Sequence, residues 1–324
     1  MDHAVADPAV FSPSDRSHFT LQKHRELISM REGESFRLLR WTSTVAAVEV
    51  ILGRGRTAPV EGHGDHWHYH PAVELTLIEK GSGTRLVADD IDMYHPGDLV
   101  LIGPNVPHYW QMRGTSAGLA IQWDFPKEHG IWSLAESTQL RSLIETARRG
   151  LQVAGPTRAL IRSKMENLVH ADGLERLGMF LQIFGELANA PRRDVKLLSD
   201  QPFSLSGTAE TQEIIRRAVS YILAHYREQV RLHDLLKLTG MSRATFARQF
   251  LLHAGKPFST FRNQVRLQAV CHALCDTSEP VGTIAFEHGF NQLSFFNRLF
   301  HREFGINPSA YRRAHFLGKI PLDG

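Results

Sequence analysis

Four side chains in the N-terminal half have the types and the spacing of a metal site. His68, His70 and Glu74 share one parity, so an extended strand projects all three from one face. A later strand carries His108. Two or three imidazoles with one carboxylate suit Fe, Mn, Ni or Zn, which makes a divalent metal the candidate cofactor. The alternative is that these side chains bond a ligand or a structural loop without metal. The other parity holds Trp67, Tyr69, Val73, Leu75 and Leu77.

The last hundred residues contain an internal repeat with a different chemistry. Gly240 is followed by Ser242 and Gly289 by Asn291, and each pair precedes a Phe-x-Arg-x-Phe segment. Each copy therefore predicts a short apolar helix, a glycine turn, a capping residue and a second helix. Glycine tolerates the left-handed conformation of a tight turn, and a Ser or Asn side chain satisfies the first free amides of a helix. This is the helix-turn-helix pattern.

The second helix of each copy is predicted to turn the stripe opposite its phenylalanines toward DNA. Phe246 and Phe250 lie one turn apart and face the core, as do Phe296 and Phe300. Such a helix fits the major groove, where Arg bonds guanine and Asn bonds adenine. The predicted DNA-binding residues are Arg243, Ala244, Ala247, Arg248, Leu293, Ser294, Asn297, Arg298, His301 and Arg302. Ordinary surface arginines are the alternative, but matched positions in a repeat favour DNA.

The net charge of +3 hides an asymmetry along the 324 residues. From Ser206 onward there are 15 Lys/Arg against 9 Asp/Glu, whereas the residues before it hold 22 against 25. The excess positive charge therefore lies in the C-terminal third, which points to an anionic partner there.

The composition excludes several classes of protein. The apolar share of 42% and the charged share of 22% are ordinary for a globular protein. No apolar run approaches the ~20 residues of a membrane span, and the N-terminus lacks a signal-peptide pattern. The two cysteines, Cys271 and Cys275, fit neither a disulfide framework nor a zinc motif. We therefore expect a cytoplasmic protein without membrane contact.

The elements that must position these residues divide the chain. Residues 36–123 contain short runs of β-branched and aromatic residues, with turns expected at Gly81–Gly83, Asp89–Asp90 and His95–Asp98. Three helical periodicities follow, and a polar stretch separates them from the repeat. The predicted organisation is an N-terminal extension (1–30), a sensor domain (31–126), a helical segment (127–198), a linker (199–211), a DNA-binding domain (212–316) and a tail (317–324).

The helical segment carries an apolar stripe of Phe180, Phe184 and Leu187. We expect this stripe to pack on a second copy of the chain and to make a homodimer. The alternative is that the helices cover only their own sheet.

Residues 213–313 resemble the double helix-turn-helix domain of the AraC/XylS family of bacterial transcription regulators. The most specific stretch is 284–313, IAFEHGFNQLSFFNRLFHREFGINPSAYRR. The resemblance implies two recognition helices, joined by a long helix at about 259–275, that enter successive major grooves. It implies base contacts from Ala244, Ala247 and Arg248, then from Leu293, Ser294, Asn297 and Arg298. It also implies transcription regulation, more often activation, with RNA polymerase as a further partner.

The N-terminal domain is similar to the cupin family. Gly62, His68, His70, Glu74 and Gly81 fit every spacing of the first cupin motif, G-x5-H-x-H-x3-E-x6-G. The second motif fits only in part, through Gly97 and His108. The resemblance implies a β-barrel (jelly roll) that binds a small-molecule effector in its mouth.

These observations predict an α+β multidomain protein: a cupin barrel, a helical segment and an all-α double helix-turn-helix domain that binds double-stranded DNA. The expected function is effector-responsive, sequence-specific transcription regulation rather than enzymatic catalysis. A metal-dependent cupin enzyme, such as a dioxygenase or isomerase carrying a DNA-binding domain, is the alternative. A third hypothesis makes residues 31–198 an oligomerisation module alone.

Overall fold

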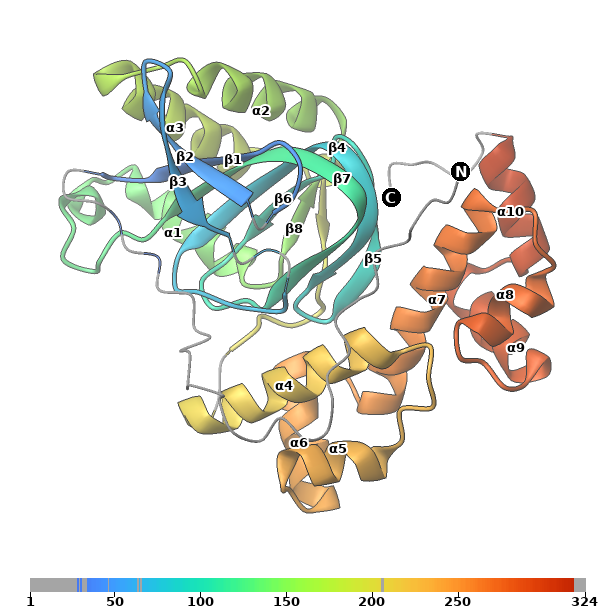
Figure 1. The fold of residues 1–324 in the computed structure, drawn as a ribbon. Helices are drawn as coiled ribbons and strands as arrows, with labels where there is room; N and C mark the ends of the chain where they lie inside the picture. The colour runs from blue at the N-terminus through green and yellow to red at the C-terminus, as the bar shows by residue number, and fades with distance from the viewer. Residues whose placement is uncertain are drawn as a thin grey trace.

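The computed structural model of this chain describes residues 28, 30, 34–45, 47–62, 64, 66–204 and 207–317. The predicted N-terminal extension and tail lie outside these residues, apart from residues 28, 30 and 317. The described part contains a curved β-sheet flanked by helices and a separate group of C-terminal helices (Figure 1). None of its helices is long and apolar enough to cross a bilayer.

The N-terminal part is built on one nine-stranded antiparallel sheet, which we call the β-sheet domain together with the helices that cover it. The strand order is β3-β2-β1-β7-β4-β6-β8-β9, and β5 pairs with β4. The strands are β1 (Arg37–Trp41), β2 (Ala47–Gly53), β3 (Arg56–Glu61), β4 (Val73–Val87), β5 (Asp90–Tyr94), β6 (Leu99–Ile102), β7 (His108–Trp123), β8 (Leu151–Val153) and β9 (Val195–Leu197).

Two long strands form the spine of this sheet, and they correct one prediction. Strand β4 pairs with β7 from Val73 opposite Trp123 to Val87 opposite His108, with register shifts around Lys80. The hairpin turn predicted at Gly81–Gly83 is therefore wrong, because the chain continues there within β4. A Cβ on Gly83 would lie 2.0 Å from the Gln111 carbonyl oxygen, so the glycine permits a close backbone approach rather than a reversal.

Three helices follow the sheet at the predicted places. They are α1 (Ser137–Ala147), α2 (Gly155–Leu168) and α3 (Gly173–Ala188), with 3-10 turns η1 (Gly130–Ser133) and η2 (Arg192–Asp194) on either side. The Asp172 side chain caps α3 by accepting a hydrogen bond from the amide of Gly173. The short strands β8 and β9, which are absent from the sequence prediction, join this helical segment to the sheet through β6.

The apolar stripe of α3 packs on its own sheet rather than on a partner. Phe180, Phe184 and Leu187 are buried in one core with residues of the strands. The ring of Phe180 stacks on Phe36 at 4.4 Å between centroids, and Phe184 meets Trp123 edge-on at 5.4 Å. The prediction that this stripe forms a dimer contact is therefore wrong, because the sheet needs it as cover.

The C-terminal part is all helical. Its helices are α4 (Ala209–His225), α5 (Leu232–Thr239), α6 (Arg243–Ala254), α7 (Phe258–Asp276), α8 (Val281–Glu287), α9 (Leu293–Phe304) and α10 (Pro308–Phe316). We call α4–α6 the first unit and α8–α10 the second unit. The long helix α7 joins them, close to the predicted position (Figure 1).

The turns of the two units confirm one predicted cap and correct the other. Gly240 adopts a left-handed φ of 67°, and the Ser242 side chain accepts a hydrogen bond from the amide of Thr245. In the second unit Gly289 has a φ of 84°. Helix α9, however, begins after Gln292, which makes no side-chain cap bond, so the predicted Asn291 cap is wrong. The exposed Asn291 lies one residue too early.

Candidate metal centre and nucleic-acid interface

The predicted histidines and glutamate converge beside the first residues of β4. His68 and His108 form an isolated backbone bridge, with N···O distances of 3.1 and 2.9 Å. Their ring centroids lie 4.1 Å apart, and those of His70 and His108 lie 4.9 Å apart. One ligand atom from each of the three imidazoles lies within 4.8 Å of the others, and all three side chains are buried. The parity argument is confirmed in that His68, His70 and Glu74 reach one place.

Backbone carbonyls orient all three imidazole rings. Nδ1 of His68 lies 2.8 Å from the carbonyl oxygen of His66, and Nδ1 of His108 lies 2.9 Å from that of Val106. Nδ1 of His70 lies 3.0 Å from the carbonyl oxygen of Ala72. Since a carbonyl only accepts, each Nδ1 carries a proton, which leaves Nε2 as the atom that each ring would offer to a metal. Metal-binding histidines are usually oriented by such a hydrogen bond.

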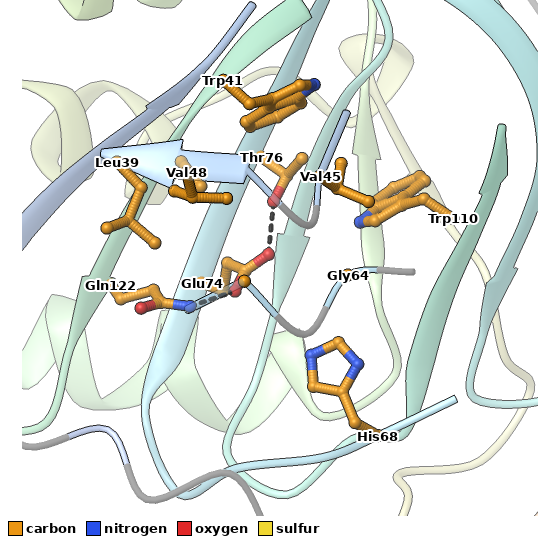
Figure 2. A pocket seen from close by; sticks show the side chains of 12 residues that line it. Leu39, Trp41, Val45, Val48, Gly64, His68, Glu74, Thr76, Trp110 and Gln122 are labelled. Atoms are coloured by element: carbon orange, nitrogen blue, oxygen red, sulfur yellow. Dashed lines mark hydrogen bonds between the residues drawn. The ribbon is translucent and has the colours of Figure 1, made fainter. Parts of the chain in front are cut away.

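Glu74 supplies the negative charge of the cluster. Its Oε2 lies 3.1 Å from Nε2 of His70 and 3.9 Å from Nε2 of His108. Gln122 donates to Oε2 at 2.7 Å, and Thr76 donates to Oε1 at 2.5 Å (Figure 2). Burial alone would raise the pKa of Glu74, but the hydrogen bond from His70 and the charges of both histidines hold it well below its usual range. The carboxylate therefore stays ionised.

The donor set fits a divalent metal. Burial, followed by the neighbouring His108 and His70, lowers the pKa of His68 well below its usual value, so its ring stays neutral and keeps a lone pair. At the His70–Glu74 contact a proton must bridge Nε2 and the carboxylate, and a cation can replace that proton. Once that proton had left, the cluster would offer three neutral imidazoles and one carboxylate, which are ligands that Fe, Mn, Ni and Zn accept.

Sequence reasoning missed Gln122 and Thr76, which orient the carboxylate. Gln122 stands directly opposite Glu74 in the β4–β7 register, and the sequence does not reveal which residues two strands place side by side. Thr76 shares the parity of Glu74, which is the one signal that pointed to it.

A small cavity adjoins the cluster inside the sheet. Its volume is about 50 Å³, far below the roughly 300–1,000 Å³ of typical pockets for drug-sized ligands. The indoles of Trp41 and Trp110 form part of its wall (Figure 2). In this conformation the cavity suits an ion with its water better than a large organic molecule.

The predicted DNA-binding residues lie on the exposed faces of α6 and α9. All ten are exposed: Arg243, Ala244, Ala247, Arg248, Leu293, Ser294, Asn297, Arg298, His301 and Arg302. Across residues 207–317 no hydrogen bond or ion pair occupies the four arginines among them. Phe246, Phe250, Phe296 and Phe300 are fully buried on the opposite faces, as predicted. Phe295, which the sequence reasoning did not select, is 40% exposed beside Ser294.

Comparisons with known proteins agree with the assignment of a DNA-binding domain to the C-terminal part. Residues 235–314 match a family described as a helix-turn-helix domain. The regulatory protein PocR of Salmonella typhimurium is 29% identical over 99 residues, which are 31% of this chain and 33% of PocR. The match therefore spans about a third of that relative's length.

Two further similarities extend over most of the chain. The transcriptional activator RhaS of Pectobacterium carotovorum is 20% identical over 267 residues, which are 77% of this chain and 88% of RhaS. The structure of ToxT from Vibrio cholerae shows 14% identity, covers 86% of this chain and 98% of ToxT, and has a TM-score of 0.33.

The type of the C-terminal domain follows from the two repeated turns, the buried phenylalanines and the sequence matches taken together. Both α6 and α9 bury the phenylalanines that the repeat predicts, and the family match covers α6 to α9 with parts of α5 and α10. The C-terminal part of the chain therefore carries a helix-turn-helix DNA-binding domain of the AraC type.

Proposed function

We propose that this protein regulates transcription by reading DNA with α6 and α9 and by sensing a divalent metal ion in the β-sheet domain. The observation that carries the first part is the pair of matched arginines, Arg248 and Arg298, on exposed faces after glycine turns. Neither guanidinium has a hydrogen-bond or ion-pair partner within the part of the chain that the structure describes, so both are available for guanine and phosphate.

The DNA test is a selection of bound sequences from a random pool of duplexes by the full-length protein. The expected product is a site with two half-sites about one helical turn apart, because the recognition helices would enter successive grooves. Enrichment of only one half-site would contradict the use of both helices.

The sensing part is supported by the imidazole cluster. We propose that the β-sheet domain is a cupin-type barrel and that His68, His70, Glu74 and His108 hold Fe, Mn, Ni or Zn. When bound, the metal would supply a positive charge that replaces the bridging proton between His70 and Glu74. The small cavity beside it favours an ion or a small molecule on that ion as the effector. A regulator is retained over a cupin enzyme because the matched relatives are named as regulators.

Metal analysis of the purified protein tests this assignment. After incubation with Zn²⁺, Mn²⁺, Ni²⁺ or Fe²⁺ and removal of excess ion, the wild type should retain about one metal per chain. His68→Ala and His108→Ala should each abolish stoichiometric binding, because a four-ligand site loses a quarter of its donors. His170→Ala, which removes an imidazole outside the cluster, is the control. Wild-type protein free of all four metals would refute the assignment.

We also propose a homodimer that uses the outer face of α3. Leu174 and Leu181 are exposed there, at 86% and 46%, in line with Gly178 and Gly185. A Cβ on either glycine would meet nothing within 4 Å, so a second helix can approach closely. The combined variant Leu174→Glu/Leu181→Glu should sediment as a monomer, whereas Leu160→Glu on α2 should not change the wild-type state. A monomeric wild type at micromolar concentration would contradict this proposal.

We further propose that the protein activates transcription, that it contacts RNA polymerase and that it is located in the cytoplasm. RhaS of Pectobacterium carotovorum is named as an activator, which favours that sign here. Transcription from a promoter carrying the selected site, measured with and without the metal, tests it. A fall in transcript upon addition of the protein would make it a repressor.

A further inference from the structure

The extended segment 67–70, which carries His68 and His70, has a second face that contacts the first unit of the DNA-binding domain. His68 points into the metal cluster, whereas its neighbours Trp67 and Tyr69 take the opposite parity. The Tyr69 hydroxyl donates a hydrogen bond of 2.5 Å to Oε1 of Gln212 in α4. Trp67 is 3% exposed and is buried in one core with Ile215 of the same helix.

The other histidine-bearing strand repeats this arrangement. His108 begins β7 within the cluster, and the next residue, Tyr109, packs against the same core as Trp67. The backbone bridge between His68 and His108 thus has imidazoles on one side and aromatic contacts with the first unit on the other. Both sides belong to the same few residues, so one cannot shift without the other.

Backbone bonds join this junction to β7 and to the loop before it. His68 and His108 exchange backbone hydrogen bonds, and the amide of Asn105 donates to the His70 carbonyl at 2.7 Å. Pro71 follows immediately. A ligand that joins imidazoles from both segments therefore adds a side-chain restraint to the backbone bridge between His68 and His108.

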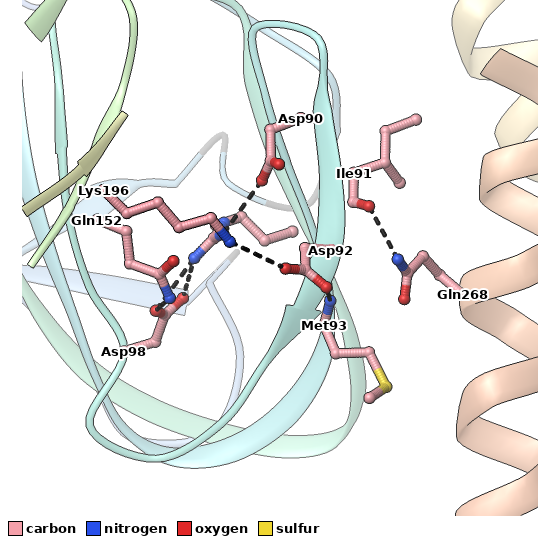
Figure 3. Close-up of polar contacts among 9 residues, drawn as sticks. Asp90, Ile91, Asp92, Met93, Asp98, Gln152, Lys196 and Gln268 are labelled. Carbon is pink, nitrogen blue, oxygen red and sulfur yellow. Dashed lines mark hydrogen bonds and ion pairs between the residues drawn. The ribbon is translucent and has the colours of Figure 1, made fainter. Parts of the chain in front are cut away.

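A second contact between the domains lies away from the cluster. The Ile91 carbonyl of β5 accepts a hydrogen bond of 2.9 Å from Gln268 of α7 (Figure 3). The opposite face of β5 is anchored in the sheet domain, where Asp90 pairs with the buried Arg85 at 3.1 Å. This contact provides an internal comparison, because no metal-cluster residue takes part in it.

We infer that metal bound by His68, His70 and His108 clamps the β-sheet domain onto α4 through Trp67, Tyr69 and Tyr109. The inference rests on the proposed metal site. Metal excludes states in which the 67–70 segment leaves the start of β7, so it raises the population of the docked arrangement. Linkage is reciprocal: metal strengthens docking by the same factor by which docking strengthens metal binding, so a change in α4 that weakens docking also weakens metal binding.

The experiment uses the full-length protein and Zn²⁺ as the probe. Hydrogen exchange of the peptide covering α4 should slow severalfold when Zn²⁺ is added, and this effect should be absent in His68→Ala. Tyr69→Phe and Gln212→Ala keep every ligand, yet each should weaken Zn²⁺ binding roughly fivefold, which corresponds to about one hydrogen bond. Gln268→Ala removes the comparison contact and should leave Zn²⁺ affinity unchanged.

The outcomes separate the two proposals. Zn²⁺ binding with no change in α4 exchange, or with equal affinity in Gln212→Ala and the wild type, overturns the clamp and leaves the metal site standing. Equal weakening by Gln268→Ala overturns the route through α4, because any loosening of the domains would then suffice. Failure of the wild type to bind Zn²⁺, Mn²⁺, Ni²⁺ or Fe²⁺ overturns the metal site and the clamp together.

Discussion

The two helix-turn-helix units come from one repeat but stand in different surroundings. The core of the first unit, around Phe246 and Phe250, also contains Trp67, Leu86 and Ile91 of the β-sheet domain. The core of the second unit, around Phe296 and Phe300, is built from its own helices and α7, and Met93 only packs against its edge. The sheet domain is thus part of the first core and a neighbour of the second.

The recognition helices differ in a complementary way. On the surface that we propose to face DNA, α6 carries Ala244 and Ala247 beside Arg248, and the two alanines can touch thymine methyl groups but cannot form hydrogen bonds with base edges. Helix α9 carries Ser294 and Asn297 beside the matched Arg298. The unit that is coupled to the sensor therefore has the weaker base-reading chemistry, and the freer unit has the stronger. We expect the second unit to set sequence preference and the first to transmit the state of the sensor.

The largest effects should come from the two cores. Phe246→Ala and Phe296→Ala each remove a fully buried ring and should cost about 3–5 kcal/mol of local stability. Hydrogen exchange resolved by segment measures where that loss appears. Phe296→Ala should speed exchange in α8–α10 alone, whereas Phe246→Ala should also speed it in β5 and residues 67–70. Faster exchange of the sheet in Phe296→Ala would break the comparison.

Base reading should depend more on the second unit. Arg298→Ala should weaken specific binding by roughly 1–3 kcal/mol if the guanidinium contacts a base, with little change on random DNA. Arg302→Ala, about one turn further along, should cause a smaller loss that is independent of sequence. Arg248→Ala is the matched change in the first unit. Titration of each variant with the selected site and with random duplex measures the loss of affinity on each DNA. If Arg298→Ala weakened binding equally on both DNAs, Arg298 would not read bases.

The contact of α7 with the sheet should be sensitive to acid. Burial, and then Arg113, lowers the pKa of His272 to about 4, and its Nε2 lies 3.2 Å from the Thr84 hydroxyl. Because the unfolded chain binds the proton more readily, the stability present above pH 6.5 is lost as the pH falls toward 4. The loss should reach roughly 2 kcal/mol at pH 5.

Urea unfolding at several pH values measures this dependence. His272→Gln keeps a polar side chain without a titrating group, so its stability should fall less steeply between pH 6.5 and 5. An unchanged slope in His272→Gln would assign the acid sensitivity to other histidines. Thr84→Val, which removes the hydroxyl partner, is the control for the hydrogen bond itself.

The smallest difference should come from the caps. Ser242→Ala should destabilise the first unit by about 1 kcal/mol, because the amide of Thr245 loses its partner. Asn291→Ala should change the second unit by no more than a few tenths of a kcal/mol, because Asn291 does not cap α9. Thermal unfolding of the two variants compares them directly, and equal shifts in Tm would contradict the observed helix start.

Local sequence patterns predicted most of the helices and turns of the DNA-binding domain. The phenylalanine spacing and the glycine turns predicted the helices and their buried faces, since both signals act within a few residues. The Asn291 cap failed by one residue because helix starts depend on turn geometry that composition does not specify. The turn predicted at Gly81–Gly83 was wrong for a related reason. Glycine occurs in β-bulges as well as in chain reversals, and only the pairing with β7 distinguishes the two.

The sequence by itself determined the parity of the imidazoles, the faces of α6 and α9 and the place of the charge, because these follow from strand and helix periods. Only the tertiary structure decided that Gln122 stands beside Glu74 and that Phe180 covers its own sheet. It alone decided that Tyr69 meets Gln212, 143 positions along the chain. Such pairings depend on the register and packing of distant segments, which no local period encodes. The coupling that we propose between the sensor and the DNA-binding domain depends entirely on such pairings of distant segments.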